Sequence, residues 1–388
     1  MNKKIKIIGA GVSGCTMANL LAEKGYEIEL YEQKSHIGGN CYDLKSKKGN
    51  LYHLYGPHIF HTKNNDVANY IKKFADFNEY INKPVSRVNK KYINLPVSLE
   101  SIKQIDPINY KEITDKLLKC FPNKTEVPVY ELNALEELKR DKKISKIISW
   151  IYLNIYAKYT SKMWGIEIEN IDKSVLNRVK ILLTNEHNYF PGAILQGLPI
   201  GGYTKMLHKM IDNKNIKLFI NTDALKKLSL REGKTFWDNK EYEGLIIYTG
   251  QIEKLIDFKF GSLPYRSLYF KFLEFNKPEY QNFTIINKPL DKKITRTVEY
   301  NKMTLIKNNS TIISHEYPGE YNIESNKWSI PYYPIQQIDN INLYNKYKEE
   351  ISKYSNILLL GRLAQYKYLD IDTTIEQAFE LFNEILKK

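Results

Sequence analysis

The chain has 388 residues, of which 43% are hydrophobic, and this is enough for two or three domains with a substantial core. Its 58 Lys and Arg exceed its 44 Asp and Glu by 14 charges. The excess is mostly lysine scattered among Asn, Ile and Tyr, which is the bias of an AT-rich coding sequence. Because no basic cluster with interleaved aromatic residues occurs, we expect no nucleic-acid partner. The surplus suits an enzyme whose ligands are diphosphates.

Membrane, secretion and metal signals are missing from the sequence. No apolar run reaches about 18 residues, and the apolar segment at 5–10 is too short for a signal peptide. Cys15, Cys41 and Cys120 cannot form a closed disulfide framework and lack metal-ligand spacing. We therefore expect a cytoplasmic protein without membrane insertion and with no metal site.

The first forty residues predict a dinucleotide-binding unit. An apolar strand at 5–8 runs into GAGVSG at 9–14, a helix follows and closes at Gly25, and a second strand at 27–31 ends on Glu32. In this fingerprint the glycines allow close backbone approach, the helix N-terminus faces the pyrophosphate, and the acid binds the ribose. The predicted cofactor-binding residues here are Gly9, Gly11, Val12, Ser13, Gly14, Glu32 and Gln33.

The identity of the dinucleotide depends on the next segment. Glu32 disfavours NADP but leaves NAD open. Gly38 and Gly39 follow it, and they let a second backbone loop approach the diphosphate, which is typical of FAD proteins. We therefore expect FAD, with Asn40 also at its site.

The remaining patterns predict an α/β fold with a discontinuous FAD-binding Rossmann domain. Helical spacing from 99 to 187 indicates an inserted helical domain, and period two from 265 to 333 indicates an antiparallel sheet. A strand at 357–360 and a helix from about Asp372 would complete the Rossmann domain. The expected domains are 1–77, 204–255 and 340–388 for FAD; 98–188 for the helical, substrate and lid domain; and 78–97, 189–203 and 256–339 for the sheet.

Ten collinear blocks, taken together, resemble the UDP-galactopyranose mutase family. They are HIGGN at 36–40, YGPHIFHT at 55–62, YTSKMWG at 159–165, NYF at 188–190, GGYTK at 201–205, YRSL at 265–268, TR at 295–296, EYP at 316–318, PYYP at 331–334 and GRLAQYKYLD at 361–370. The resemblance implies that reduced FAD acts as a nucleophile through its N5. The flavin–sugar adduct then opens and recloses, converting the pyranose of a UDP-sugar to a furanose for cell-surface glycan synthesis without net oxidation.

The resemblance also implies roles for individual residues. Arg178 and Arg296 match two diphosphate-binding arginines, whose forked guanidinium groups suit phosphate oxygens. His61 matches the histidine beside the flavin, and Trp164 matches a mobile-loop tryptophan that closes over the nucleotide. The other substrate-binding matches are Asn82, Tyr159 (stacking on uracil), Tyr189, Arg266, Glu316, Tyr333, Tyr368 and Asp370. The cofactor would further contact His58, Ile59, His61, Arg362, Tyr368, Asp370 and Ile371.

Four departures from the family pattern leave the sugar open among UDP-galactopyranose and related hexoses, deoxysugars and pentoses. They are Ile155 for an aromatic residue, Lys158 for glycine, Gln365 for glutamate and Leu182 for a common arginine. If the helix carrying Arg178 continues, Leu182 lies on the same face and gives the pocket an apolar wall suited to a sugar lacking a hydroxyl. The main alternative function is a flavin-dependent oxidoreductase of the same glycine-motif class. The oligomeric state stays open, with a homodimer as one option.

Overall fold

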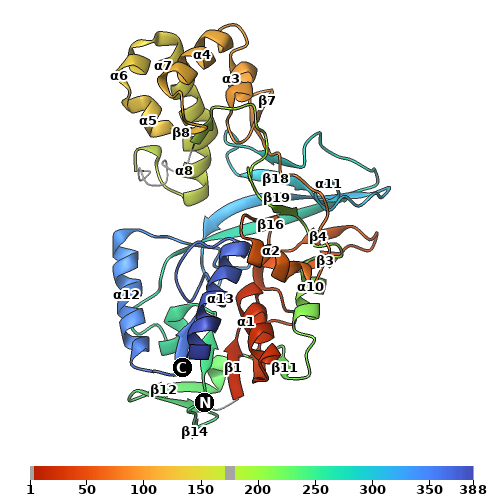
Figure 1. The fold of residues 1–388 in the computed structure, drawn as a ribbon, viewed down its shortest axis with the longest axis vertical. Coiled ribbons are helices and arrows are strands. Elements are labelled where there is room, and N and C mark those ends of the chain that lie inside the picture. The colour runs from red at the N-terminus through yellow and green to blue at the C-terminus, as the bar shows by residue number, and fades with distance from the viewer. Residues whose placement is uncertain (1–3, 171–179, 388) are drawn as a thin grey trace.

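A parallel sheet of five strands forms one end of the molecule. The computed structural model describes residues 4–170 and 180–387. The strand order is β11-β2-β1-β15-β21, and every pairing is parallel (Figure 1). The strands span Ile216–Phe219 (β11), Glu27–Tyr31 (β2), Lys4–Ile8 (β1), Ile246–Tyr248 (β15) and Ile357–Leu359 (β21). The predicted strands at 5–8, 27–31 and 357–360 are therefore confirmed, and the C-terminal one joins the N-terminal sheet.

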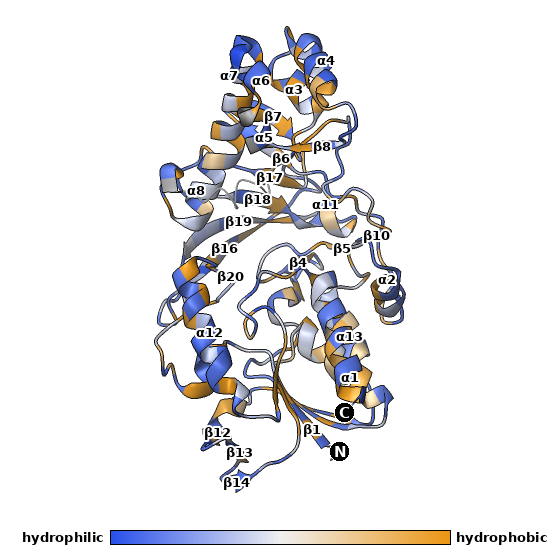
Figure 2. Cartoon of the chain, turned by 60° about the vertical axis from the view of Figure 1, so that its left-hand side comes forward, coloured by the Kyte–Doolittle hydropathy of each residue, from blue (hydrophilic) through white to orange (hydrophobic). Residues whose placement is uncertain are grey.

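Helices cover this sheet on both faces, as in a doubly wound fold. Helices α1 (Val12–Glu23), α10 (Tyr203–Met210) and α13 (Ile371–Lys387) share one apolar core with the sheet. Helix α12 (Ile338–Ser352) contributes to a separate core on the other face. Figure 2 shows the strands around β1 as largely hydrophobic, whereas α12 carries many hydrophilic residues. The predicted Rossmann-type architecture is thus confirmed.

A second sheet of seven strands lies between the parallel sheet and a helical segment (Figure 1). Its order is β20-β16-β19-β18-β17-β6-β7, and all pairings are antiparallel except that of β17 with β6. The period of two over 265–333 correctly predicts its long strands, because alternate side chains face the core. The strands span Val85–Val88 (β6), Lys91–Asn94 (β7), Tyr265–Phe275 (β16), Ile285–Asn287 (β17), Arg296–Glu299 (β18), Thr311–Glu320 (β19) and Tyr333–Pro334 (β20), with helix α11 (Tyr300–Thr304) between β18 and β19.

The segment predicted as helical is mostly helical and has its own apolar core. Its helices are α3 (Leu99–Ile105), α4 (Tyr110–Cys120), α5 (Val129–Ala134), α6 (Glu136–Arg140), α7 (Lys142–Ile151) and α8 (Lys158–Trp164), with a π-helical stretch η2 (Tyr152–Ala157) and a 3-10 turn η3 (Ile168–Asn170). Strands β8 (Glu126–Pro128) and β9 (Lys180–Leu182) pair antiparallel within it, so the purely helical prediction is wrong there.

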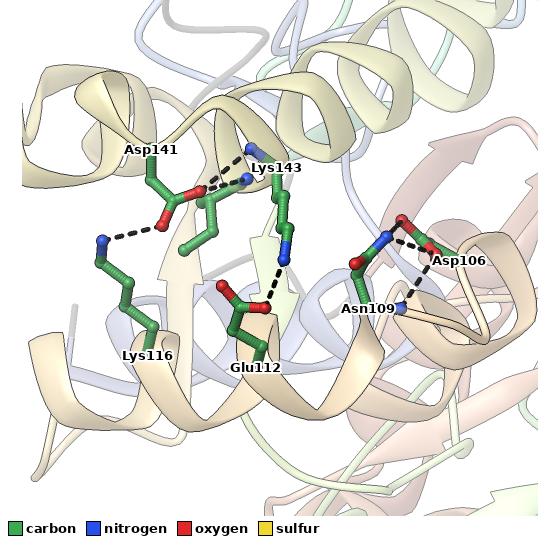
Figure 3. Close-up of polar contacts among 7 residues, drawn as sticks. Asp106, Asn109, Glu112, Lys116, Asp141 and Lys143 are labelled. Carbon is green, nitrogen blue, oxygen red and sulfur yellow. Dashed lines mark hydrogen bonds and ion pairs between the residues drawn. The ribbon is translucent and has the colours of Figure 1, made fainter.

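Polar contacts fix α4 against the start of α7 (Figure 3). Asp141 accepts hydrogen bonds from the backbone N–H groups of Lys143 and Ile144, capping α7, and pairs with Lys116 at 2.9 Å. Lys143 pairs with Glu112 at 2.6 Å. The Lys143–Glu112 pair is exposed and the Lys116–Asp141 pair is partly exposed, so water screens both and they stabilise the segment less than its apolar core does.

The remaining elements connect these parts. They are η1 (Gly39–Cys41), β3 (Asp43–Lys45), β4 (Leu51–His53), β5 (Phe60–Thr62), α2 (Asn65–Lys72), β10 (Leu195–Gly197), η4 (Ala224–Lys226), β12 (Leu228–Arg231), β13 (Lys234–Trp237), β14 (Lys240–Glu241) and η5 (Ile252–Ile256). None of the helices within 4–170 and 180–387 is long and apolar enough to cross a membrane. We propose the three sets of domain boundaries given above as the division of the chain.

Candidate active site

A cavity of about 470 Å³ lies at the carboxyl ends of the parallel strands, where ligands bind in such folds. The predicted cofactor residues that line it are Gly9, Gly11, Val12, Ser13, Glu32, Gln33, Gly38, Gly39, Asn40, His58, Arg362 and Ile371. We call it the cofactor cavity.

Close backbone packing explains why the turn before α1 is rich in glycine. Gly9 has a φ of +105°, and a Cβ there would lie 2.1 Å from the Thr249 hydroxyl. A Cβ on Gly14 would lie 1.8 Å from the Gly9 carbonyl oxygen, so Gly14 lets α1 approach the turn. Gly14 is not among the residues that line the cavity, and its predicted contact with the cofactor stays a prediction.

Gly11 and Gly39 both line the cavity, and their backbones lie in close contact with each other. A Cβ on Gly39 would come within 3.2 Å of the Gly11 Cα, whereas one on Gly11 would meet nothing closer than 3.8 Å. The N-terminus of α1 directs unpaired backbone N–H groups to this place. A diphosphate fits this cradle, and side chains would fill it.

Glu32 is held at the end of β2 by backbone donors. One carboxylate oxygen accepts a hydrogen bond from the Ala10 N–H and the other from the Lys34 N–H, both at 2.9 Å. Each oxygen keeps a second lone pair for a ribose hydroxyl. The residues present therefore fit a dinucleotide such as FAD, with Glu32 at its ribose.

A second cavity of about 320 Å³, which we call the substrate cavity, adjoins the first. His58, Arg362 and Ile371 line both cavities, so a long cofactor can reach from one into the other. The predicted site residues that line the substrate cavity are His58, Ile59, His61, Asn82, Tyr159, Tyr189, Arg296, Tyr333, Arg362, Tyr368, Asp370 and Ile371. They come from the β5 region, α8, the seven-stranded sheet, the start of α13 with the segment before it, and the connecting segments that hold Asn82 and Tyr189.

Arg296 is one of two arginines that line the substrate cavity, the other being Arg362, and Glu316 fixes its orientation. The Arg296 Nε donates to one Glu316 carboxylate oxygen at 2.6 Å, and the other oxygen accepts from the Thr295 hydroxyl at 2.7 Å. Burial lowers the pKa of Arg296, but the negative charge of Glu316, with smaller contributions from two nearby tyrosines, outweighs burial and holds this pKa above its usual value. The terminal guanidinium nitrogens remain for an anionic ligand.

Among the tyrosines that line the substrate cavity, Tyr159, Tyr189 and Tyr333 lie near Arg296, whereas the Tyr368 ring packs against Arg362, with 4.9 Å between the guanidinium carbon and the ring centroid. Tyr189 and Tyr368 are 47% and 45% exposed, so they lie at the mouth of the cavity, whereas Tyr159 and Tyr333 are less exposed. Burial raises the pKa of Tyr159 and of Tyr333, so their hydroxyl groups stay protonated and can donate to phosphate or sugar oxygens.

The two histidines differ in their surroundings. The His58 Nδ1 lies 2.8 Å from the Gly56 carbonyl oxygen, and its backbone N–H donates to the His53 Nδ1 at 3.0 Å. Burial lowers the pKa of His58 to about 4, so the ring is neutral near pH 7. His61 stacks on Phe190 with centroids 3.7 Å apart, and its Nε2 lies 4.0 Å from an Asp370 oxygen.

Three other predicted residues lie outside both cavities. Glu316 accepts the hydrogen bond from the Arg296 Nε and so orients that arginine without lining the cavity itself. The Arg266 Nε donates to the Met163 carbonyl oxygen at 2.9 Å, so it stabilises the end of α8. Trp164 is the last residue of α8, with its ring centroid 6.3 Å from that of Tyr333. Arg178 lies outside the described residues.

The prediction that Leu182 lies on a helical face beside Arg178 is wrong. Leu182 belongs to strand β9, pairs with Glu126 and donates its N–H to the Val97 carbonyl oxygen at 2.8 Å. Its side chain is buried and does not line the substrate cavity. Backbone pairing with β8 overrides the assumed helix, and the apolar wall inferred from this residue is withdrawn.

Sequence reasoning missed several cavity residues. Thr222, Asp223 and Lys254 line the cofactor cavity just after β11 and β15. Their position after parallel strands is a signal that could have found them, because such strands end at the same edge. Phe190 stacks on His61 and has no comparable signal. Among the described residues no cluster of potential metal ligands occurs.

The fold and the two cavities define a dinucleotide-binding enzyme with an adjoining site for an anionic substrate. A model of NAD(P)-binding Rossmann-like domains matches residues 7–74, and a model of UDP-galactopyranose mutase matches residues 154–368. The chain therefore belongs to the UDP-galactopyranose mutase family. It is an isomerase, and its fold neighbours support a flavin cofactor.

Individual relatives agree with this assignment. The UDP-galactopyranose mutase of Mycoplasma genitalium is 39% identical, over 98% of this chain and 94% of the relative. The dTDP-fucopyranose mutase of Escherichia coli is 31% identical, over 97% of each chain. A crystal structure of reduced UDP-galactopyranose mutase has a similar fold, with a TM-score of 0.68 and 16% identity over 99% of this chain and 95% of that one.

Proposed function

We propose that this enzyme uses reduced FAD to interconvert the pyranose and furanose forms of a UDP-sugar, for cell-surface glycan synthesis. One observation carries the proposal: Arg296, oriented by Glu316, lines a cavity that adjoins the cofactor cavity. A fixed guanidinium fork suits the diphosphate of a nucleotide sugar, and it would lie beside the flavin.

The cofactor and the protein would divide the chemistry. Reduced FAD would supply the nucleophile for the anomeric carbon, from which the nucleoside diphosphate departs. Arg296 would bind the departing diphosphate, and the protonated hydroxyls of Tyr159 and Tyr333 would donate to it. We keep Arg178 as the second diphosphate-binding arginine, on the resemblance alone.

UDP-galactopyranose is the first substrate to test. The Mycoplasma genitalium relative named for it is more similar to this chain than the dTDP-fucopyranose mutase is. With Leu182 buried between strands, no described residue argues for a deoxysugar instead. The three cysteines are unpaired, which suits a reducing compartment, and we keep the cytoplasm as the proposed location.

The experiment is a comparison of oxidised and dithionite-reduced protein on a panel of UDP-sugars. The panel contains UDP-galactopyranose, UDP-arabinopyranose and a UDP-6-deoxyhexose, and the products are separated by chromatography. We expect furanose product from the reduced protein only, with the highest kcat/KM for UDP-galactopyranose. A tenfold higher kcat/KM for another sugar would make that sugar the substrate instead. A difference of one group on the sugar can produce such a ratio, because it is worth about 1–3 kcal/mol in an apolar pocket.

The same experiment tests the alternative, a flavin-dependent oxidoreductase. An oxidoreductase would consume oxygen or a nicotinamide in proportion to product. A mutase would form product without consuming either. Redox turnover without ring conversion would overturn the proposed function.

A further inference from the structure

Lys162 makes an unusual contact between α8 and the seven-stranded sheet. Its half-buried ammonium group donates to three backbone carbonyl oxygens, those of Lys288, Asp291 and Ile294, at 2.5, 2.6 and 2.8 Å. An ammonium has three N–H donors, and all three are used here. The contact therefore satisfies Lys162 completely while leaving it outside both cavities.

The three carbonyls converge because the loop at 288–295, between β17 and β18, is tightly folded. One Asp291 carboxylate oxygen accepts hydrogen bonds from the Lys293 and Ile294 backbone N–H groups, both at 2.8 Å. The Lys288 N–H donates to the Thr295 carbonyl oxygen at 2.8 Å and closes the loop. The loop thus presents a concave set of acceptors to α8.

This loop leads directly into the arginine of the substrate cavity. Thr295 donates its backbone N–H to the Glu316 carbonyl oxygen at 2.9 Å, and Arg296 donates to the Glu316 carboxylate. Helix α8 also carries Tyr159, which lines the same cavity. Lys162 therefore joins two walls of the substrate cavity that come from distant parts of the chain.

We propose that Lys162 is a positioning residue that holds the 288–295 loop, and through it Arg296, against Tyr159 for binding of the substrate's nucleoside diphosphate. The inference rests on the proposed function, which gives Arg296 the diphosphate. Lys162 does not touch the ligand, so its effect reaches the substrate through the loop.

The charge state of Lys162 gives a test that a purely structural contact would not pass. Burial lowers the pKa of Lys162 to about 8, while Asp291 raises it and Lys288 lowers it further. His315 and Arg87 lie around Lys288 and complete the charged groups on the sheet side. Above about pH 8 the neutral amine has two N–H donors for three carbonyls, so the loop is held less firmly.

The experiment measures the Kd of UDP for the FAD-bound protein at about pH 7 and about pH 9, a range that spans the titration of Lys162. The variants are Lys162→Met, which removes the donors, and Lys162→Arg, which keeps the charge at both pH values. Lys143→Met is the matched control, because that lysine lies on α7 and pairs with Glu112 in solvent. FAD content and the flavin spectrum are recorded for each variant.

We expect Lys162→Met to raise the Kd at pH 7 by about tenfold or more, because charged hydrogen bonds are lost. The wild type should bind UDP more weakly at pH 9 than at pH 7, and both lysine-162 variants should lose this difference. Lys143→Met should match the wild type at both pH values.

Two results would overturn the inference while leaving the proposed function intact. One is near-normal UDP binding by Lys162→Met at pH 7, and the other is the wild-type pH difference persisting in Lys162→Arg. The second result decides the matter even if Lys162→Met loses its flavin. A wild type that binds FAD but not UDP would instead refute the proposed function, and this inference with it.

Discussion

The cofactor cavity and the substrate cavity are built in different ways. The first is lined partly by backbone of the glycine turn and of the segment at 38–41, and partly by residues of separate segments such as 222–225 and 248–251. The second consists of side chains from distant elements, with Asn82, Tyr159, Arg296 and Tyr368 brought together only by the fold. The comparison teaches that the glycine-lined part of the first cavity depends on local conformation, whereas the second cavity depends on how α8 and the two sheets are placed.

The largest expected effect is a loss of the cofactor. Gly11→Asp should abolish FAD binding, because the carboxylate would occupy the diphosphate's place, while the backbone tolerates a Cβ there. The measurement is flavin absorbance per protein after purification and after reconstitution. Gly25→Asp is the control, since a Cβ at Gly25 meets nothing within 4 Å; its positive φ should cost about 1–2 kcal/mol of stability without loss of FAD. Normal flavin content in Gly11→Asp would contradict the assignment of this cavity.

The second effect is confined to the substrate cavity. Arg296→Ala should lower kcat/KM by about 30-fold to several thousand-fold while FAD stays bound, because truncating one partner of a buried charge pair costs about 2–5 kcal/mol. Arg296→Lys should recover little, since an ammonium lacks the guanidinium fork. Arg231→Ala, on the exposed end of β12, should behave as wild type. If Arg296→Ala also lost its flavin, the prediction that this arginine serves substrate binding and not cofactor binding would be wrong.

The third effect concerns two buried histidines: His58, which lines both cavities, and His53, which accepts a hydrogen bond from the His58 backbone N–H. Burial lowers the pKa of His58 to about 4 and that of His53 to about 3, against about 6.5 when unfolded. Between about pH 6.5 and pH 4 the unfolded chain binds protons that the folded chain does not, so stability falls as pH falls. Each histidine should contribute about 1.4 kcal/mol per pH unit within that window.

Chemical unfolding at a series of pH values measures this slope. His53→Phe should reduce it relative to the wild type, because one of the two buried histidines is removed. A slope identical in both proteins would show that His53 takes up its proton in the folded state.

The smallest effect is expected at Trp164, beside the substrate cavity. UDP binding should change the tryptophan fluorescence of the protein. Trp164→Ala should weaken UDP binding several-fold, because an aromatic contact is worth about 0.5–1.5 kcal/mol. The flavin spectrum of this variant should not change. Trp150→Phe, in the helical segment, is the control and should keep the fluorescence response. An unchanged response in Trp164→Ala would remove this residue from the binding site.

The difference between the cavities also explains what could be predicted. The strand, glycine turn, helix and Glu32 follow one another within 32 residues, so local pattern alone predicts this part of the cofactor cavity, but not Thr222, Asp223 or Lys254. Arg296 and Tyr159 have no local signal, and only the resemblance to a family singled them out. The prediction that Leu182 lies on a helix was wrong because β9 pairs with β8. This contact joins residues 126 and 182, and helical spacing cannot reveal it. Lys162 lies within the YTSKMWG segment, and no local pattern predicts its role, because its three acceptors lie more than 120 residues away along the chain.

The most direct test of the central claim is anaerobic turnover by enzyme whose flavin has been reduced once and then freed of reductant. The account predicts many conversions of UDP-galactofuranose to UDP-galactopyranose per flavin, with the flavin absorbance remaining that of the reduced form throughout. Flavin that becomes oxidised as product forms, with no more than one product molecule per flavin, would contradict it.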